Sequence, residues 1–425
     1  MQRTGLPFNR EKLEALRDEL SEANQRMGAE FVLALDAALP EDEKLPRDPD
    51  GSLNLRPKAT GTIRGGDKRP AGFNYGSPHQ LKRVFTALLG ETPVDADGKP
   101  SCSRAALREY AADHSVVAQY LKWKRVEKRR QMVEALLKHQ DPDGFIRASY
   151  LQMGADTGRM SAMSPNLMQI PRDDSFRQCV EAPDGWVIVD ADFAQMELRL
   201  AAAEAGDEVM AQAFKDGADL HTVTARAIYG LRYEEVDDTE RKAMRQIAKS
   251  ANFGLLFGSG AKGLRSYAGA MGIQMTITEA AQIRDKFHEV YKGISEWQRR
   301  AAAACQVSGA DASLRIRVSG LRRFLPGEHN KVTTRANTPV QGAGAAVLKL
   351  ALSKLWPLVF DAGEDEVRIA SCIHDECILL VKEGYEEKWA KILTDTMEQA
   401  EARWLGDIPP LAEAHYGKTW AAAKG

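Results

Sequence analysis

The chain has 425 residues, of which 44% are hydrophobic and 28% are charged. A chain of this length exceeds one ordinary hydrophobic core, so we expect roughly two or three subdomains. Its 58 basic and 60 acidic side chains give a net charge of -2, which excludes bulk charge as the means of attracting a polyanion. Any nucleic-acid site must therefore be built from local basic clusters.

The cysteine content indicates a reducing compartment. The five cysteines form an odd number without a C-x-x-C pair, which favours free thiols over a disulfide framework. The sequence has no basic and apolar leader, and no uninterrupted apolar run is long enough to cross a bilayer. We therefore expect an intracellular, cytoplasmic protein without a membrane partner.

Two helices with a long loop between them are predicted near the start of the chain. Leu13, Leu16 and Leu20 recur near helical spacing within residues 9–38, which predicts a helix there. Residues 40–76 are rich in Pro, Gly and charged side chains, a composition typical of a mobile or binding loop.

The second helix is predicted to begin at Ser77, with Pro78 in its first turn and Gln80 able to reach back to the cap.

A further helix, over residues 121–137, carries six basic side chains. A solvated helix face and a phosphate-contacting face fit this pattern equally well. The six are Lys122, Lys124, Arg125, Lys128, Arg129 and Arg130.

A first group of acidic residues lies where a strand is predicted to pass into a helix. WVIVDADF, from Trp186 to Phe193, has the β-branched and apolar content of a buried strand, and helix-forming residues follow. Asp190 and Asp192 are two residues apart and would share one strand face, so spacing alone does not select between them. Glu197 lies one turn into the helix.

A second acidic group is predicted in EVRIASCIHDECILLV, as two apolar strands bent at His374, Asp375 and Glu376. A solvent-exposed turn is the simple interpretation, although tight turns usually favour Gly or Asn. The alternative is that carboxylates near Asp192 and Asp375 meet over one sheet, where they could hold two divalent cations.

Helical patterns dominate residues 211–304, and within them three basic residues and two aromatic residues recur along one helix face as a stripe. Two interpretations of this stripe stay open. Its basic end could be solvated while its aromatic end lies in the core, or the stripe could bind a ligand that has a polyphosphate at one end and a base at the other. A strand-like basic segment follows at residues 313–326, and a helix is predicted through residues 347–355. The stripe consists of Arg241, Arg245, Lys249, Phe253 and Phe257, which recur every four residues.

Taken in order, six motifs resemble those of the family A DNA polymerases, the bacterial DNA polymerase I family. Weaker similarity at GLPFNREKL and HYGKTWAAAKG extends the resemblance to essentially the whole chain. The motifs are TGRMSAMSPNLMQIP (157–171), DFAQMELR (192–199), DLHTVTA (219–225), RQIAKSANFGLLFG (245–258), RANTPVQGAGA (335–345) and IHDE (373–376).

This resemblance implies an α+β fold of the right-hand polymerase type, with an antiparallel-sheet palm and mostly helical fingers and thumb. We expect the thumb and the thumb–palm connection at residues 1–150. The palm would occupy residues 151–205 and 336–425, with the fingers at residues 206–335 between its two parts.

The implied activity is DNA-directed DNA synthesis, in which deoxynucleotides are added to a primer 3′-hydroxyl and pyrophosphate is released. Asp192 and Asp375 match the two metal-binding aspartates, and the main-chain carbonyl of Phe193 is a further expected ligand. Two Mg²⁺ ions, for which Mn²⁺ can substitute, would activate the hydroxyl and stabilise the transition state. Arg245 and Lys249 match residues that hold the triphosphate, and Lys249 would also protonate the pyrophosphate.

Other matches concern the choice of nucleotide. His221 matches a triphosphate contact, although a lone histidine at a helix start is more often structural. Phe253 matches the aromatic that packs on the incoming sugar and base, in the form that discriminates against dideoxynucleotides, and Phe257 replaces a Tyr of many relatives. Glu197 matches a steric gate against the ribose 2′-hydroxyl. Gln195 is also placed in the nucleotide site.

The resemblance also implies a DNA-binding set. The minor groove near the primer end, the primer terminus and the duplex backbone would be contacted by different members of this set. The basic loop at residues 44–69 is expected to serve the duplex as well. The set is Arg159, Asn337 and Gln341 for the minor groove, His374 for the terminus, and Lys124 and Arg125 for the backbone.

Two departures from the bacterial pattern, Met168 in place of Gln and the spacing of Arg335, are more typical of phage or plasmid polymerases. The chain begins almost at the expected thumb, so either Met1 is an internal methionine of a longer protein or a separate exonuclease supplies proofreading. We expect no 3′ to 5′ exonuclease activity in this chain.

The expected partners are primer–template DNA and deoxynucleoside triphosphates, with a separate exonuclease or processivity factor as a further one. The protein would act as a monomer in the cytoplasm of a bacterial or phage-infected cell. Single-subunit RNA polymerases are the alternative within the enzymes. A non-catalytic primer–template binder is the alternative outside them, but a binder would not need both metal aspartates and the triphosphate stripe.

Overall fold

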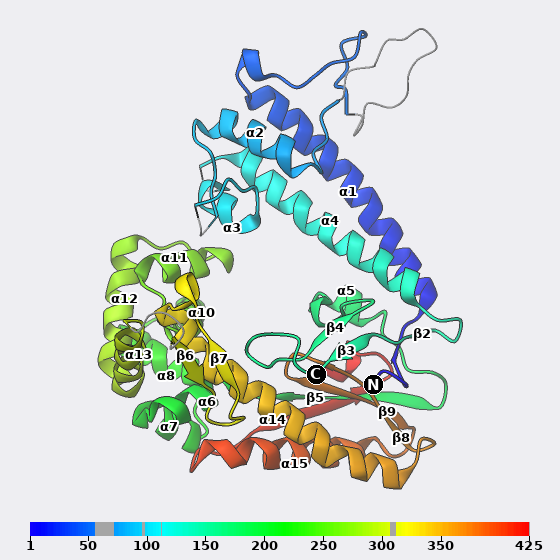
Figure 1. Cartoon of the computed structure of the whole chain (residues 1–425), viewed down its shortest axis with the longest axis vertical. Coiled ribbons are helices and arrows are strands. Elements are labelled where there is room, and N and C mark those ends of the chain that lie inside the picture. Colours follow the sequence, from blue (N-terminus) through cyan, green and yellow to red (C-terminus); the bar gives the residue numbers. More distant parts are fainter. Residues whose placement is uncertain (56–71, 96–97, 112, 307–311, 425) are drawn as a thin grey trace. The chain divides into compact units, whose positions relative to one another are not determined.

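A computed structural model describes residues 1–55, 72–95, 98–111, 113–306 and 312–424 (Figure 1). The chain divides into two compact units. One is Glu11–Lys138, and the other combines Met1–Arg10 with His139–Gly425. The boundaries of these units differ from the range 1–150 that we expected for the thumb and the thumb–palm connection. The assignment of thumb, palm and fingers stays a prediction.

The unit Glu11–Lys138 is helical. Helices α1 (Arg10–Ala38) and α4 (Ser115–His139) confirm the two helices predicted from spacing and from the basic pattern. Their apolar faces meet in an aromatic core, where the rings of Phe31 and Tyr120 have centroids 5.3 Å apart. The smaller elements are η1 (Glu41–Glu43), α2 (Pro78–Leu89), α3 (Arg104–Leu107) and η2 (Arg108–Ala111).

The predicted capping box at the start of α2 is wrong. Ser77 occupies the N-cap position, but its side chain makes no capping hydrogen bond. Gln80 does not reach back to Ser77, because its Oε1 accepts the backbone N–H of Asn74 at 2.6 Å. The side chain thus fastens the preceding turn to the helix. Of the long loop predicted before Ser77, residues 56–71 lie outside the described part of the chain.

The larger unit is organised around an antiparallel sheet of four strands in the order β10-β5-β9-β8. Because side chains alternate along a strand, Val189 and Ala191 of β5 face the apolar core, whereas Asp190 and Asp192 face the other side. This sheet confirms the predicted strands and the α+β class. The strands are β5 (Trp186–Phe193), β8 (Val367–Ile373), β9 (Glu376–Lys382) and β10 (Ala412–Gly417).

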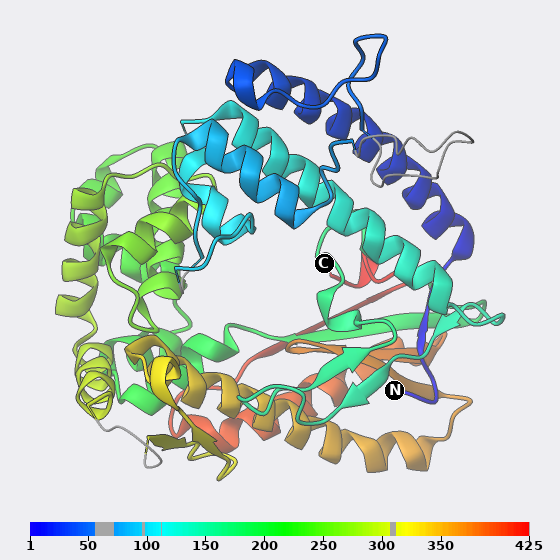
Figure 2. The same cartoon turned by 45° about the horizontal axis from the view of Figure 1, so that its top comes forward.

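Two helices, α14 (Val332–Ala362) and α15 (Glu386–Leu405), cover the apolar face of this sheet (Figure 1 and Figure 2). A third helix, α6 (Met196–Ala205), packs against both of them. By length and composition, α14 is the one helix of the described residues that could cross a membrane. Its packing against α6, α13 and α15 accounts for its small and apolar residues.

A helical group fills the chain between α6 and α14. Helices α8 and α10 pack against each other, and an aspartate caps the N-terminus of each, Asp219 for α8 and Asp237 for α10. The group consists of α7 (Glu208–Lys215), α8 (Leu220–Tyr229), α9 (Arg232–Glu235), α10 (Asp238–Leu255), α11 (Ala261–Ala270), α12 (Ile277–Val290) and α13 (Lys292–Ala304).

Short elements complete the larger unit. Strands β6 and β7 pair as a hairpin in the basic segment that was predicted to be strand-like. The other strands pair as β1 with β2 and β3 with β4. The elements are β1 (Leu6–Pro7), β2 (Phe145–Ile146), β3 (Ser149–Leu151), β4 (Ser161–Met163), η3 (Leu167–Gln169), α5 (Asp174–Arg177), β6 (Ser313–Arg315), β7 (Arg322–Phe324), η5 (Gly327–His329) and η6 (Ala422–Lys424).

Candidate active site

The register of the sheet brings the two predicted acidic groups together. Asp192, on β5, pairs directly opposite Glu376, the first residue of β9. The turn between β8 and β9 therefore contains only His374 and Asp375, and Glu376 is buried rather than exposed in the turn. Asp190 lies on the same strand face as Asp192. Four carboxylates from two distant segments thus gather at one end of the sheet.

The backbone is strained on both sides of this cluster. His374 has a φ of 59° and Gln195 has a φ of 57°, which is the left-handed region that non-glycine residues seldom adopt. Among the described residues, Ser164 is the only other non-glycine residue with positive φ. Each such conformation costs on the order of 1 to 3 kcal/mol and is often found at functional sites. The strain occurs where β5 turns into α6 and where β8 turns into β9.

A lysine near the end of the chain lies among the carboxylates. Lys424 Nζ is 2.8 Å from Asp190 Oδ2, 2.9 Å from Glu376 Oε1 and 3.8 Å from Asp192 Oδ2. Burial disfavours its charge, but Asp190 and Glu376 outweigh that effect and raise the pKa of Lys424. No local pattern could have indicated this residue, because its partners lie on strands that are remote in sequence.

The structure separates Asp190 from Asp192. Asp190 is only 2% exposed, and it accepts a hydrogen bond from Trp420 Nε1 at 3.2 Å. Burial and then the charge of Glu376 raise the pKa of Asp190 to about 6. Asp192 is partly exposed, and burial followed by the charge of Asp375 raises its pKa to about 7. Asp190 is therefore enclosed by protein groups, whereas Asp192 is accessible.

The carboxylate oxygens suit a divalent cation. Asp192 Oδ1 is buried without a hydrogen-bond partner among the described residues, as are Asp190 Oδ1 and Glu376 Oε2. Asp375 is partly exposed, and the nearest cation to it is Arg172, at 4.0 Å. Hard cations prefer such oxygens. Because the described residues contain no ready group of three protein ligands, substrate oxygens and water would have to complete the coordination of a metal ion.

The predicted triphosphate residues lie on α8 and α10. Arg245 forms a bidentate pair with Asp219, in which Nε and Nη2 donate at 2.7 and 3.0 Å. Burial opposes ionisation of Asp219, but hydrogen bonds from Arg245 and Thr222 lower its pKa to about 2. The guanidinium is therefore paired within the protein.

A buried hydrogen-bond chain fixes His221. Asn252 Nδ2 donates to His221 Nδ1 at 2.9 Å, and Asn252 Oδ1 accepts from Thr224 Oγ1 at 2.9 Å. Thr224 Oγ1 also lies 2.7 Å from the hydroxyl of Tyr291. Burial lowers the pKa of His221 to about 4, so the ring is neutral at pH 7. Because Nδ1 accepts, the ring proton is assigned to Nε2, where it can be donated.

The stripe expected on one helix is only partly correct. Helix α10 ends at Leu255, so Phe257 lies in the turn that follows. The Arg241 side chain binds backbone carbonyls of the segment that precedes α10. Its Nε donates to the carbonyl of Tyr233 at 3.2 Å, and its Nη2 donates to that of Val236 at 3.0 Å.

Lys249 and Phe253 lie on the part of α10 that does carry the stripe. The side chain of Lys249 has no hydrogen bond or ion pair with another residue in the described part of the chain. The ring centroid of Phe253 lies 5.8 Å from that of His221. An unpaired ammonium, a paired guanidinium and an imidazole N–H are thus presented by α8 and α10.

The predicted steric gate is paired with a predicted DNA contact. Glu197, in the first turn of α6, forms an ion pair and a hydrogen bond with Arg159. Asn337 and Gln341 are partly exposed one turn apart on α14, and Asn337 Oδ1 has no partner among the described residues. The buried Oε1 of Gln195 is also without a partner there. The remaining assigned residues are Phe193 at the end of β5 and Lys124 and Arg125 on α4 of the smaller unit.

Arg199 is a supporting residue to which no role was assigned from the sequence. Its Nε donates to the carbonyl of Ala194 at 2.9 Å, and its Nη1 donates to that of Pro409 at 2.6 Å. Its guanidinium also lies 4.4 Å from the ring centroid of Phe214. It therefore fastens the β5–α6 turn, from which Asp192 and Glu197 are presented, to the segment before β10.

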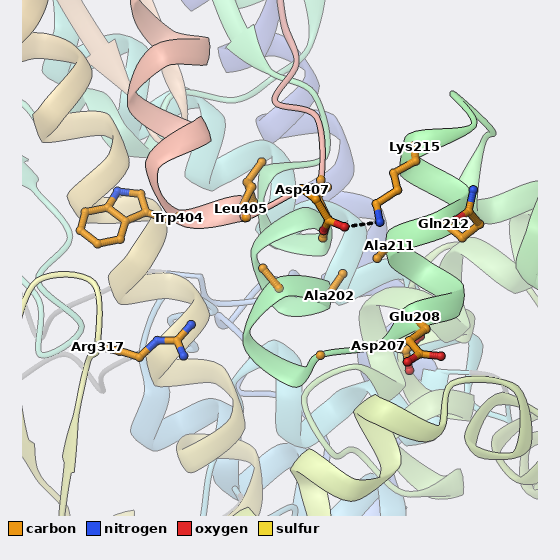
Figure 3. A pocket seen from close by; sticks show the side chains of 14 residues that line it. Ala202, Asp207, Glu208, Ala211, Gln212, Lys215, Arg317, Trp404, Leu405 and Asp407 are labelled. Atoms are coloured by element: carbon orange, nitrogen blue, oxygen red, sulfur yellow. Dashed lines mark hydrogen bonds and ion pairs between the residues drawn. The ribbon is translucent and has the colours of Figure 1, made fainter.

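A cavity of about 600 Å³ lies away from these residues (Figure 3). Its lining comes from α6, α7 and the segment around the end of α15, and includes Ala202, Lys215, Trp404 and Asp407. Lys215 and Asp407 point toward each other and form an ion pair (Figure 3). None of the predicted site residues lines this cavity, so it is separate from the carboxylate cluster.

Comparisons with known proteins agree with the motif order. The model of the family "DNA polymerase family A" matches residues 66–422. DNA polymerase I of Aquifex aeolicus is 32% identical over 350 residues, 81% of this chain and 58% of that protein. DNA polymerase I of Pseudomonas aeruginosa is 32% identical over 369 residues, 83% of this chain and 38% of that protein. The chain thus spans 38% to 58% of the length of these relatives.

A solved structure also resembles the chain. It is described as the "POL domain of Pol1 from M. smegmatis complex with DNA primer-template and dNTP". The TM-score is 0.76 at 24% sequence identity, and the match covers 99% of this chain and 68% of that one. At this identity the similarity concerns the fold, which is that of a polymerase domain with an antiparallel sheet.

Proposed function

Because the chain belongs to DNA polymerase family A, we propose that it is a DNA-directed DNA polymerase. It would add deoxynucleotides to a primer 3′-hydroxyl along a template and release pyrophosphate. The observation that carries this proposal is the register of β5 and β9, which gathers Asp192 and Asp375 at one end of the sheet. Primer–template DNA and deoxynucleoside triphosphates are the proposed partners.

Asp192 and Asp375 would hold two Mg²⁺ ions, with the carbonyl of Phe193 as a further ligand. When bound, the ions activate the 3′-hydroxyl and neutralise charge that develops on the phosphoryl group. The unpartnered Asp192 Oδ1 and the partial exposure of Asp375 support this assignment. Lys424 pairs with one carboxylate oxygen each of Asp190 and Glu376, and the positive charge so close to both residues argues against their serving as ligands.

His221 of α8 and the two cations of α10, Arg245 and Lys249, would bind the triphosphate. Arg245 would exchange Asp219 for phosphate oxygens, because both present the planar pair of acceptors that a guanidinium recognises. His221 would donate its Nε2–H. Lys249 would contact the phosphates and protonate the departing pyrophosphate. Phe253 would pack on the incoming sugar and base.

Glu197 would exclude the ribose 2′-hydroxyl, with Gln195 beside it at the start of α6. Since Phe257 has no hydroxyl, it cannot hydrogen-bond a carboxylate, and the Arg159 pair is the interaction that restrains Glu197. Shortening Glu197 to Ala should raise ribonucleotide incorporation, and unchanged incorporation would reject the gate. The same assay separates this enzyme from an RNA polymerase, which would prefer ribonucleotides without the substitution.

The DNA-binding assignments are proposed on the same basis. Arg159, Asn337 and Gln341 would contact the minor groove, and His374 would lie beside the primer terminus. Lys124 and Arg125 would contact the duplex backbone. We also propose that the chain acts as a monomer without 3′ to 5′ exonuclease activity. Metal-dependent trimming of a mismatched primer by the purified protein would contradict this.

Primer extension with Mg²⁺ and all four deoxynucleotides tests the main proposal, with Mn²⁺ in a parallel reaction. We expect extension by the unaltered chain and its loss in Asp192→Asn and Asp375→Asn. Asp184→Asn is the matched control, because Asp184 is an exposed aspartate just before β5. DNA binding without extension would instead identify a non-catalytic binder. Dideoxynucleotide incorporation as efficient as that of deoxynucleotides would contradict the role of Phe253.

A further inference from the structure

We propose that Lys424 is a positioning residue for the divalent-cation site, because it keeps Asp190 and Glu376 paired and thereby confines cation binding to Asp192 and Asp375. The inference rests on the proposed function for the roles of Asp192 and Asp375. It assigns to the C-terminal segment a part in selecting which of four neighbouring carboxylates bind metal.

The position of Lys424 is set by the segment that carries it. The backbone N–H of Trp420 donates to the carbonyl of Val180 at 3.0 Å, and its indole N–H donates to Asp190. The Trp420 side chain is only 1% exposed. At Gly417, where β10 approaches η6, an added Cβ would lie 2.6 Å from the Cβ of Ala422. The segment is therefore packed closely against the sheet, and the ammonium is held in place.

The cations near this cluster lie at different distances from its carboxylates. Arg172 and Arg177 approach Asp375 and Glu376 no closer than 4.0 and 3.8 Å. Among the described residues, Lys424 is the cation that lies within hydrogen-bond distance of two of the acids, at 2.8 and 2.9 Å. Removing it would leave the buried Asp190 without a nearby counter-charge and Glu376 with only the more distant Arg177, which is strongly unfavourable. A divalent cation would then be drawn to these acids.

The identity of the residue also matters. An ammonium donates hydrogen bonds and cannot act as a metal ligand, so it occupies one oxygen each of Asp190 and Glu376 without completing a cation site. Its distance of 3.8 Å from Asp192 Oδ2 exceeds a hydrogen bond. Asp192 thus experiences the positive charge but keeps its oxygens available. Cation binding is directed toward the β8–β9 turn, where Asp375 is partly exposed.

The test compares Lys424→Met, Lys424→Arg and the control Lys388→Met in the full chain. Lys388 forms an ion pair with Glu366 at 2.5 Å, away from the carboxylate cluster. Titration with Mn²⁺ alone, without DNA, measures cation affinity, and primer extension measures the rate. For Lys424→Met we expect Mn²⁺ to bind about tenfold more tightly while extension slows about tenfold or more. Lys424→Arg should restore both toward the unaltered values.

Opposite changes in affinity and rate are the signature that a merely structural role would not produce. Unchanged Mn²⁺ affinity in Lys424→Met would overturn the proposal. So would a joint fall of affinity, rate and melting temperature, with no recovery in Lys424→Arg. If the unaltered chain does not extend primers, the proposed function fails, and the Mn²⁺ titration still reports whether Lys424 directs the cation.

Discussion

The carboxylate end of the sheet differs from the group of His221, Arg245 and Lys249 on α8 and α10 in where its residues come from and in how many of its polar atoms have partners. The carboxylates come from segments far apart in sequence, and several of their oxygens have no partner among the described residues. The cationic group comes from two neighbouring helices, and its polar atoms are largely satisfied, Arg245 by Asp219 and His221 by Asn252. The first region is therefore prepared to accept a ligand, whereas in the second region Arg245 must exchange its internal partner Asp219 for one.

The largest expected effect comes from Asp192→Asn. Because the carboxylate end would act on the reacting atoms, the single-turnover extension rate should fall about a thousandfold or more. Nucleotide affinity, measured in the same titrations, should change little. An equally large loss of nucleotide affinity would erase the distinction between the two regions.

Lys249→Ala should have the next largest effect. The unpaired ammonium would stabilise charge on the triphosphate in the transition state, so its loss should lower the extension rate about a hundredfold. Lys242→Ala, an exposed lysine on the same helix, is the matched control. Equal losses in the two variants would show that α10 acts only through its overall charge.

Acidification should reveal the buried His221. The pKa of this group is about 4 in the folded protein and 6.5 in the unfolded chain. The unfolded state therefore binds the proton first, and the stability that neutral His221 contributes is complete above about pH 6.5. As the pH falls toward 4, roughly 3 kcal/mol of the free energy of unfolding should be lost.

His221→Gln should reduce this loss in urea denaturation at about pH 7.5 and about pH 4.5. His415→Gln, at an exposed histidine in β10, should leave the loss unchanged. If the His221 variant retained the full pH dependence, the neutral buried ring would be the wrong description of this region.

The smallest expected effect is that of Asp219→Asn. The amide oxygen can still cap α8, but the charge that holds Arg245 is removed. Because Arg245 would no longer have to leave a carboxylate, KM for the nucleotide should fall roughly two- to fivefold. Asp237→Asn, at the corresponding cap of α10, should not change it. A rise in KM would mean that Asp219 orients Arg245 rather than competing for it.

The two regions also differ in how far the sequence could predict them. Residues on one helix have fixed spacing, so the four-residue period predicted that Arg245, Lys249 and Phe253 lie along α10. The period could not show that the helix ends at Leu255, or that Asp219, 26 residues from Arg245, pairs with it. Local geometry is encoded locally, whereas partners depend on packing.

At the carboxylate end, the strands and the bend between them were predicted correctly because apolar and β-branched content is a local signal. The difference between Asp190 and Asp192 could not be derived from spacing, since Trp420 and Lys424 create it from a remote part of the chain. Glu376 was expected in the turn for the same reason: only the register of β5 with β9 shows that it belongs to a buried strand.

The hydrogen-bond chain from Tyr291 through Thr224 and Asn252 to His221 has a consequence for variation in this protein. Tyr291 is buried and lies between α12 and α13. It reaches the imidazole only through two intermediate side chains. A substitution at Tyr291 is therefore expected to change how firmly the imidazole is oriented, and with it the proposed contact of His221 with a triphosphate, without altering any residue of the proposed site.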